Sequence, residues 1–181
     1  MDDLGRHYFD DALRELRKYK AFAERAAAQV EDEAWFRTLD PESNSIALVM
    51  KHMTGNMRSR WTDFLTTDGE KPSRNRDSEF VTEDSDTAAS IRERWEDGWA
   101  RVFGAIEALE PADLGKTITI RGEKHTVLQA INRQLTHYAS HVGQIVFLAK
   151  HLAGDRWESL SIPRGKSLQF DVRKSGAPYR P

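Results

Sequence analysis

The stretch TVLQAINRQLTHYASHVGQIVFLAKHLAG, residues 126–154, decides how this chain is expected to fold. Its apolar residues recur every three or four positions, as they do on one face of an amphipathic helix. The residues that carry this pattern are Leu128, Ile131, Leu135, Val142, Ile145 and Leu152. Gly154 follows the last of them and is a typical helix stop. We therefore predict one long helix over residues 126–154.

Three earlier stretches show the same spacing and predict helices over residues 6–30, 45–66 and 86–109. Turn-forming and helix-capping residues at 40–45 precede the second of these stretches. The step from Glu110 to Pro111 disfavours helical backbone and ends the third. The chain is thus built mainly from four amphipathic helices.

The segments between and after the helices are polar or short. Residues 117–123 contain a short β-like run and a glycine, which predicts a small β-hairpin before the last helix. Residues 68–85 combine Gly, Pro and many charges without a period, which predicts a long surface connection. Residues 155–181 keep apolar side chains such as Phe170 and are expected to form an ordered C-terminal coat. The expected fold is all-α, a single four-helix-bundle domain over residues 1–181.

Composition narrows both the class of protein and the kind of site. The 181 residues include 27 Lys and Arg against 29 Asp and Glu, so no basic surplus favours nucleic acid or anionic lipid. No run of roughly 18 apolar residues predicts a membrane span, and we expect a cytoplasmic protein without nucleic-acid or membrane partners. Cysteine is absent, which leaves His, Asp and Glu as the strong metal ligands.

Three histidines form the candidate metal site. His137 and His141 are four residues apart, so on a helix they lie about 40° apart on one face, and we expect them to point inward. His52 lies in the second helix among Val49 and Met53, where an unused imidazole is a costly core residue. Three neutral imidazoles suit Zn²⁺ or Ni²⁺ with a coordination position left open. A histidine pair at this spacing is also common as a structural or surface feature, so spacing alone leaves both readings open.

Two long segments resemble a known family. Residues 43–80, SNSIALVMKHMTGNMRSRWTDFLTTDGEKPSRNRDSEF, and residues 133–150, RQLTHYASHVGQIVFLAK, are similar to the two signature segments of a DinB-like (YfiT-like) subfamily. Residues 161–170, SIPRGKSLQF, also resemble that subfamily, and the similarity covers nearly the whole chain. Members of this superfamily are metal-binding four-helix bundles.

The resemblance implies a set of functional properties. In the superfamily, one histidine of the second helix and an HxxxH pair of the last helix bind a divalent metal ion, which corresponds to His52, His137 and His141 and to one ion per chain. The resemblance also implies homodimers. For characterised relatives it implies transfer of low-molecular-weight thiols to electrophiles, or metal-dependent hydrolysis.

Other polar residues lie close to the histidines in the sequence. Asn56, Gln134 and Gln144 each lie within about one turn of a histidine, where they either hold an imidazole or a ligand, or are ordinary helix residues. Four arginines fit either an anionic substrate or a solvated surface: Arg58, Arg60, Arg74 and Arg76. No Asp or Glu lies within one turn of the three histidines on their own helices, so no general base is evident.

Two functions follow from this reading. In the first, the metal activates a thiol or water against an electrophile, which makes the protein a transferase or hydrolase with a small-molecule substrate. In the alternative, it is a non-catalytic metal-binding stress-response module. The open coordination position favours the enzyme, and the missing acid or base favours the module. Trp61, Trp95 and Trp99 are most simply core or dimer-interface aromatics. Trp61 and Trp99 exceed what one apolar stripe per helix requires, and we expect a homodimer through such faces.

Overall fold

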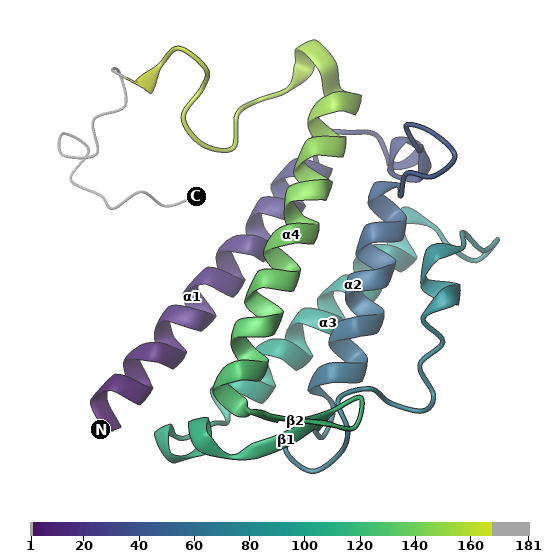
Figure 1. Cartoon of the computed structure of the whole chain (residues 1–181). Coiled ribbons are helices and arrows are strands. Elements are labelled where there is room, and N and C mark those ends of the chain that lie inside the picture. The colour runs from purple at the N-terminus through teal and green to yellow at the C-terminus, as the bar shows by residue number, and fades with distance from the viewer. Residues whose placement is uncertain (1, 168–181) are drawn as a thin grey trace.

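The computed structural model describes residues 2–167, which form a four-helix bundle (Figure 1). The helices are α1 (Asp2–Ala27), α2 (Ile46–Trp61), α3 (Ala88–Glu107) and α4 (Val127–Ala153). A two-stranded hairpin precedes α4. The predicted all-α class, with four helices and a small hairpin before the last one, is confirmed.

The end of α2 is the helix boundary that differs most from the prediction. The helix ends at Trp61 rather than at residue 66. Asp63 adopts a left-handed backbone with φ 49°, and its carbonyl oxygen accepts the amide hydrogens of Thr66 and Thr67. A left-handed residue cannot continue a right-handed helix, so the chain turns away there.

Helices α1 and α4 lie side by side and run in the same direction (Figure 1). Near the start of both, the hydroxyl of Tyr8 donates to Oδ1 of Asn132 at 2.8 Å. Beyond their other ends, Oε1 of Gln29 accepts the backbone amide hydrogen of Glu158 at 2.7 Å. These two contacts pair the early parts and the late parts of the two helices, which fixes the parallel orientation.

Helices α2 and α3 are also parallel. Nζ of Lys51, near the start of α2, donates to Oδ2 of Asp86 just before α3, at 2.7 Å. Arg101, well along α3, donates to the hydroxyl of Thr62 at the end of α2. Parallel neighbours cannot be joined by a short turn, so the connection between them has to return along the bundle.

Residues 62–87 form this connection, which we call the crossover. The crossover touches α2 near its end, where the hydroxyl of Ser59 donates to the carbonyl oxygen of Gly69 at 3.1 Å. Its short 3-10 turn, η2 (Asp77–Phe80), lies against the middle of α2. The predicted connection over residues 68–85 is therefore a crossover that follows a helix, and not a loop over bare surface.

The hairpin consists of β1 (Thr117–Ile120) and β2 (Glu123–Thr126). Arg121 and Gly122 form its turn with φ 54° and 76°, the left-handed pair that two-residue hairpin turns favour. The carboxylate of Asp68 accepts the amide hydrogens of both turn residues at 2.8 Å. The hairpin therefore holds the first part of the crossover in place.

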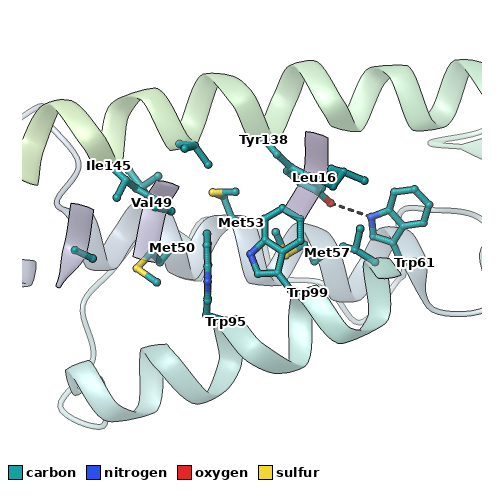
Figure 2. Close-up of a cluster of buried hydrophobic side chains, with 14 of the residues drawn as sticks. Leu16, Val49, Met50, Met53, Met57, Trp61, Trp95, Trp99, Tyr138 and Ile145 are labelled. Atoms are coloured by element: carbon teal, nitrogen blue, oxygen red, sulfur yellow. Dashed lines mark hydrogen bonds between the residues drawn. The ribbon is translucent and has the colours of Figure 1, made fainter. Parts of the chain in front are cut away.

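Aromatic residues and methionines fill the centre of the bundle (Figure 2). Trp95 and Trp99 of α3 meet edge to face with ring centroids 5.6 Å apart, and Trp99 lies 5.5 Å from the ring of Tyr138 in α4. Gly98 lets α2 approach α3, because a Cβ at this position would lie only 3.0 Å from Sδ of Met57. This core is ample without any metal ion.

Trp61 and Trp99 belong to the core, which was one of the two expected roles, and the expectation that they are surplus to the core is wrong. Their exposed fractions are 3% and 0%. The indole N–H of Trp61 donates to the hydroxyl of Tyr138 at 3.0 Å (Figure 2), so the polar edge of the ring also has its partner inside the bundle. Homodimerisation stays a prediction, and these two side chains offer no exposed surface for it.

The segment after α4 begins with Gly154, whose φ of 56° ends the helix as predicted. Trp157 and Leu160 then pack, half-buried, against the core. Phe170, on which the predicted C-terminal coat also relied, lies outside the described residues. None of the helices within residues 2–167 is long and apolar enough to cross a membrane.

The hydroxyl of Tyr138 joins α2 to α4, because it accepts from Trp61 and donates to Oδ1 of Asn56 at 3.2 Å. Tyr138→Phe leaves two buried polar groups without this partner and is expected to lower the free energy of unfolding by about 1–3 kcal/mol. Urea denaturation measures the change. Tyr19→Phe is the control, since its hydroxyl has no hydrogen-bond partner within residues 2–167, and equal losses in both variants would contradict the role given to Tyr138.

Candidate metal centre

The structure brings the three predicted histidines together where α2 meets α4. The two helices run antiparallel, and His52 of α2 faces His137 and His141 on successive turns of α4. Each histidine offers one ring nitrogen within 4.8 Å of the other two. The Nε2 atoms of His137 and His141 are 3.0 Å apart, so one ion with metal–nitrogen bonds of about 2.0–2.1 Å reaches both. The cluster could therefore hold a divalent metal ion.

The histidines of α4 are less buried than expected. His52 is buried, but His137 and His141 are only partly buried. Tyr138 and Val142, one residue further along, take the inward direction instead. Because each residue turns the helix by about 100°, the two histidines lie at the edge of the apolar face, where they remain accessible.

Glu79, in η2 of the crossover, holds the ring of His52. Its Oε2 atom lies 2.9 Å from Nδ1 of His52, and both side chains are buried. An ionised carboxylate only accepts hydrogen bonds, so Nδ1 carries the ring proton and Nε2 is left with its lone pair free. The ring of Phe80 stacks on the same imidazole with centroids 4.7 Å apart. The crossover thus determines both the tautomer and the orientation of His52.

Arg74 in turn holds Glu79. Its Nε and Nη2 atoms donate to the two carboxylate oxygens at 2.7 and 2.8 Å, which is a bidentate pair. Burial by itself raises the pKa of Glu79, but the hydrogen bonds from Arg74 and His52 outweigh burial and hold the pKa below its ordinary value. Glu79 therefore stays ionised beside the imidazole.

Gly55 makes room for this carboxylate. It lies on α2 three residues after His52, and a Cβ at this position would be 2.6 Å from Cδ of Glu79 and closer still to its Oε1. The carboxylate cannot retreat without losing its bonds to Arg74 and His52. A residue with a side chain at position 55 is therefore incompatible with the observed position of Glu79.

The sequence analysis did not assign Glu79 to the site. Glu79 is 27 residues from His52, in a stretch without periodicity. The sequence analysis looked for an Asp or Glu near the histidines only on the helices that carry them. The carboxylate comes instead from the crossover. One signal was present, because the resemblance over residues 43–80 continues beyond α2 and includes Glu79.

Gln134 and Gln144 contact the other two imidazoles. Oε1 of Gln144 lies 2.9 Å from Nδ1 of His141, and Oε1 of Gln134 lies 3.4 Å from Nδ1 of His137. In all three histidines Nδ1 thus faces an oxygen atom, which leaves Nε2 for a metal ion. Gln134 is buried, whereas Gln144 is exposed.

Asn56 lies one turn after His52 and borders the same pocket. Its Oδ1 atom accepts the hydroxyl hydrogen of Tyr138 at 3.2 Å. This contact ties α2 to α4 directly beneath the histidines, so Asn56 has a structural partner as well as a place beside a bound ligand.

The histidines of α4 are neutral near pH 7. Burial, reinforced by the neighbouring His141 and His52, lowers the pKa of His137 from 6.5 to about 3. Burial also lowers the pKa of His141, and its hydrogen bond to Gln144 offsets this only in part. The neutral imidazole is the form that binds metal, so protons do not compete with an ion at neutral pH.

A pocket of about 430 Å³ opens beside His52 and His137. Five arginines line it: Arg60, Arg74, Arg76, Arg121 and Arg133. Three of the four arginines singled out from the sequence are therefore at the pocket, whereas Arg58 is exposed and does not line it. Arg121, in the hairpin turn, was missed because it is far from all three histidines in the sequence, whereas Arg133 was missed although it lies one helical turn before His137.

A family model described as protein of unknown function (DUF1572) matches residues 3–166. The chain belongs to the DUF1572 family. No curated protein matches it. The match runs from α1 to the end of α4 and beyond, so the three histidines, Glu79 and the pocket arginines of this DUF1572 chain all lie within the family region.

Gly55→Ala tests the contact between α2 and the crossover in this DUF1572 protein. The new Cβ is expected to displace Glu79 and to weaken Zn²⁺ binding by about 10–100-fold, because His52 loses the group that orients it. Calorimetric titration measures the affinity. Gly104→Ala on α3 is the matched control, since a Cβ there meets nothing within 4 Å. Unchanged affinity in Gly55→Ala would show that Glu79 does not matter to the site.

The stability of the metal-free protein should fall as the pH is lowered from 7.5 to 5. His137 has a pKa of about 3 when folded and 6.5 as its ordinary value, so between these values the unfolded chain binds more protons. The free energy of unfolding then decreases as the pH falls below 6.5. Urea denaturation at both pH values measures this dependence. His137→Ala should reduce it and His151→Ala, at an exposed position, should not; the same slope in all three proteins would exclude His137 as its source.

Proposed function

We propose that this DUF1572 protein binds one divalent metal ion, Zn²⁺ or Ni²⁺, through His52, His137 and His141, and uses it in a transferase or hydrolase reaction. A thiol or water is the nucleophile, and a small molecule is the electrophile. The observation that carries the proposal is the combination of three converging histidines with a pocket that opens beside them.

The donor set fits an open metal site. Among residues 2–167, the cluster contains three histidines and no fourth His, Cys, Asp or Glu ligand. Structural zinc sites are usually closed by four protein ligands, whereas catalytic sites keep a position for a substrate or water. A divalent ion in such a site acts as a Lewis acid and lowers the pKa of a thiol or water that binds to it. The protein residues supply the orientation, since Glu79, Gln134 and Gln144 each hold one imidazole.

Glu79 acts as a positioning residue and not as a general base. Both of its oxygens already accept hydrogen bonds, from Arg74 and His52, and its pKa lies below the ordinary value. Transfer of a proton to Glu79 would break the contacts that hold His52. Acid–base help from this residue is therefore not part of the proposal.

Two hollows meet at Ser140, next to the histidines. The first is the arginine-lined pocket, and the second, of about 510 Å³, is bordered by Gln144 and by apolar side chains such as Phe147 and Leu148. One polar and one partly apolar hollow suit two different reactants. This arrangement favours transfer of a thiol to an electrophile over hydrolysis.

Two further properties belong to the proposal. We place the DUF1572 chain in the DinB-like superfamily, supported by the four-helix bundle and by the histidines on its second and last helices. We also propose a homodimer, as that resemblance implies. The non-catalytic metal-binding module is the alternative, and the lack of a free acid or base near the cluster among residues 2–167 favours it.

His137→Ala tests the function. Wild-type protein purified without chelator is expected to carry about one equivalent of divalent metal per chain, and the variant to lose tight binding while keeping its helices. Activity is measured with a small thiol plus a chromogenic aryl halide, and with a nitrophenyl ester, each with and without EDTA. Turnover should require both the metal and His137, and His151→Ala should behave like wild type.

Three results would contradict this proposal. The absence of metal in the purified protein, together with flat titrations with Zn²⁺ and Ni²⁺, would remove the site. Loss of the circular dichroism signal when metal is stripped would show a structural ion. Metal binding without turnover of either kind of substrate would favour the non-catalytic module.

A further inference from the structure

The pocket is bounded by two matching rows of side chains. On α2, His52, Asn56 and Arg60 follow one another at intervals of four residues, and all three line the pocket. Residues at this interval lie on roughly one face of a helix, with about 6 Å of rise between them. The α2 row therefore begins with a metal ligand and ends, about 12 Å along the helix axis, with a buried guanidinium.

The second row lies on α4. Arg133, His137 and His141 follow one another at the same interval, and the first two of them line the pocket. Because α4 runs antiparallel to α2, Arg133 lies towards Arg60 while the histidines of both helices meet at the other end. The pocket thus has a histidine end and an arginine end, about two helical turns apart.

Arg60 is a buried cation with hydrogen-bonding capacity to spare. Its exposed fraction is 3%, and neither its Nε nor its Nη1 atom has a hydrogen-bond partner within residues 2–167. Its nearest carboxylate oxygen, Oε2 of Glu70, lies 3.7 Å from Nη2, which is too long for a hydrogen bond. A buried guanidinium without hydrogen bonds is costly. Nη2 makes no hydrogen bond within residues 2–167 and, unlike Nε and Nη1, is not among the fully buried atoms, so it is the atom to which an anion in the pocket would supply an acceptor.

The other charges around the pocket leave a positive surplus. Arg74 is paired with Glu79, and Arg121 is paired with Glu70, whose Oε2 lies 3.1 Å from its Nε. These two carboxylates neutralise two of the five arginines, and none of the described residues that line the pocket is acidic.

Arg76 and Arg133 have no ion-pair partner among the described residues, and Arg60 has only the distant Glu70, which it shares with Arg74 and Arg121. Arg76 instead lies over the ring of Phe80, with its Cζ 5.5 Å from the ring centroid, and Arg133 is exposed on α4. Three cations therefore face one pocket in a chain whose net charge is −2. The positive charge is local and is not a consequence of composition.

We propose that the arginine end of this pocket binds the oxyanion of a small ligand, a carboxylate or a phosphate group, through Arg60 and Arg133. The ligand reaches from there towards the histidines. Guanidinium groups bind both kinds of oxyanion in a bidentate manner, and 430 Å³ is room for a small organic molecule. This proposal rests on the proposed function in one respect only, namely that the other end of the ligand meets a metal ion. Binding of the oxyanion by the arginines does not require the metal.

Anion titrations of chelator-treated protein test the subsite. Inorganic phosphate and malonate are titrated separately by calorimetry at constant ionic strength, and the tighter of the two identifies the preferred oxyanion. Saturable binding of at least one is expected, with an affinity at least about tenfold lower in Arg60→Gln and in Arg133→Gln, because each loses charge-assisted hydrogen bonds. Arg58→Gln, on α2 but not at the pocket, is the matched control and should bind as wild type does.

Circular dichroism shows whether each variant folds. If the buried Arg60→Gln does not fold, the exposed Arg133→Gln decides alone. No saturable binding of either anion, or an equal loss in Arg58→Gln, overturns the proposal. Binding that requires added Zn²⁺ also overturns it, because the anion is then a metal ligand. These titrations use metal-free protein, so they give the same result whether or not the histidines bind a metal ion. The anion subsite and the metal site can therefore be disproved independently.

Discussion

The hydrogen bond between Glu79 and His52 is the contact on which the functional half of this molecule depends. It requires a crossover that returns along α2, and this crossover exists because α2 and α3 are parallel. It also requires a glycine at position 55, where any side chain would meet the carboxylate. Arg74 completes the arrangement by keeping that carboxylate charged. A feature of the topology, a missing side chain and an ion pair therefore combine to hold one imidazole in one tautomer.

The residues that stabilise the fold are largely different from those that form the candidate site. The interior is filled by tryptophans, methionines and Tyr138, and these side chains pack on one another without help from the histidines (Figure 2). Tyr138 is the link between the two regions, since its ring belongs to the core while its hydroxyl meets Asn56 beside the pocket. Because the buried apolar side chains stabilise the bundle without the histidines, the edge of the core can carry a polar and positively charged pocket.

The sequence was sufficient to predict whatever is periodic or local. The four helices, the hairpin and the stop at Gly154 follow from spacing, turn residues and a glycine. The meeting of His52 with His137 and His141 followed from spacing together with family resemblance. Glu79 and Arg121 could not be placed from spacing, because their positions depend on how the crossover and the hairpin pack on α2. Arg133 could have been, since it lies one helical turn before His137 on the predicted last helix. The tryptophans were misjudged for the same reason, since a count of apolar residues per helix does not reveal how much volume lies between two parallel helices.

Beyond Phe64, which is part of the core, the crossover is attached to the bundle mainly through polar contacts. Between residues 65 and 87 only Gly69 and Glu79 are buried, so this segment adds little apolar surface to the interior. Segments of this kind open locally at free energies well below that of global unfolding. Such an opening withdraws Glu79 from His52 while the helices stay closed. An ion at this centre would then exchange at a rate governed by the motion of one surface segment, and not by unfolding of the bundle.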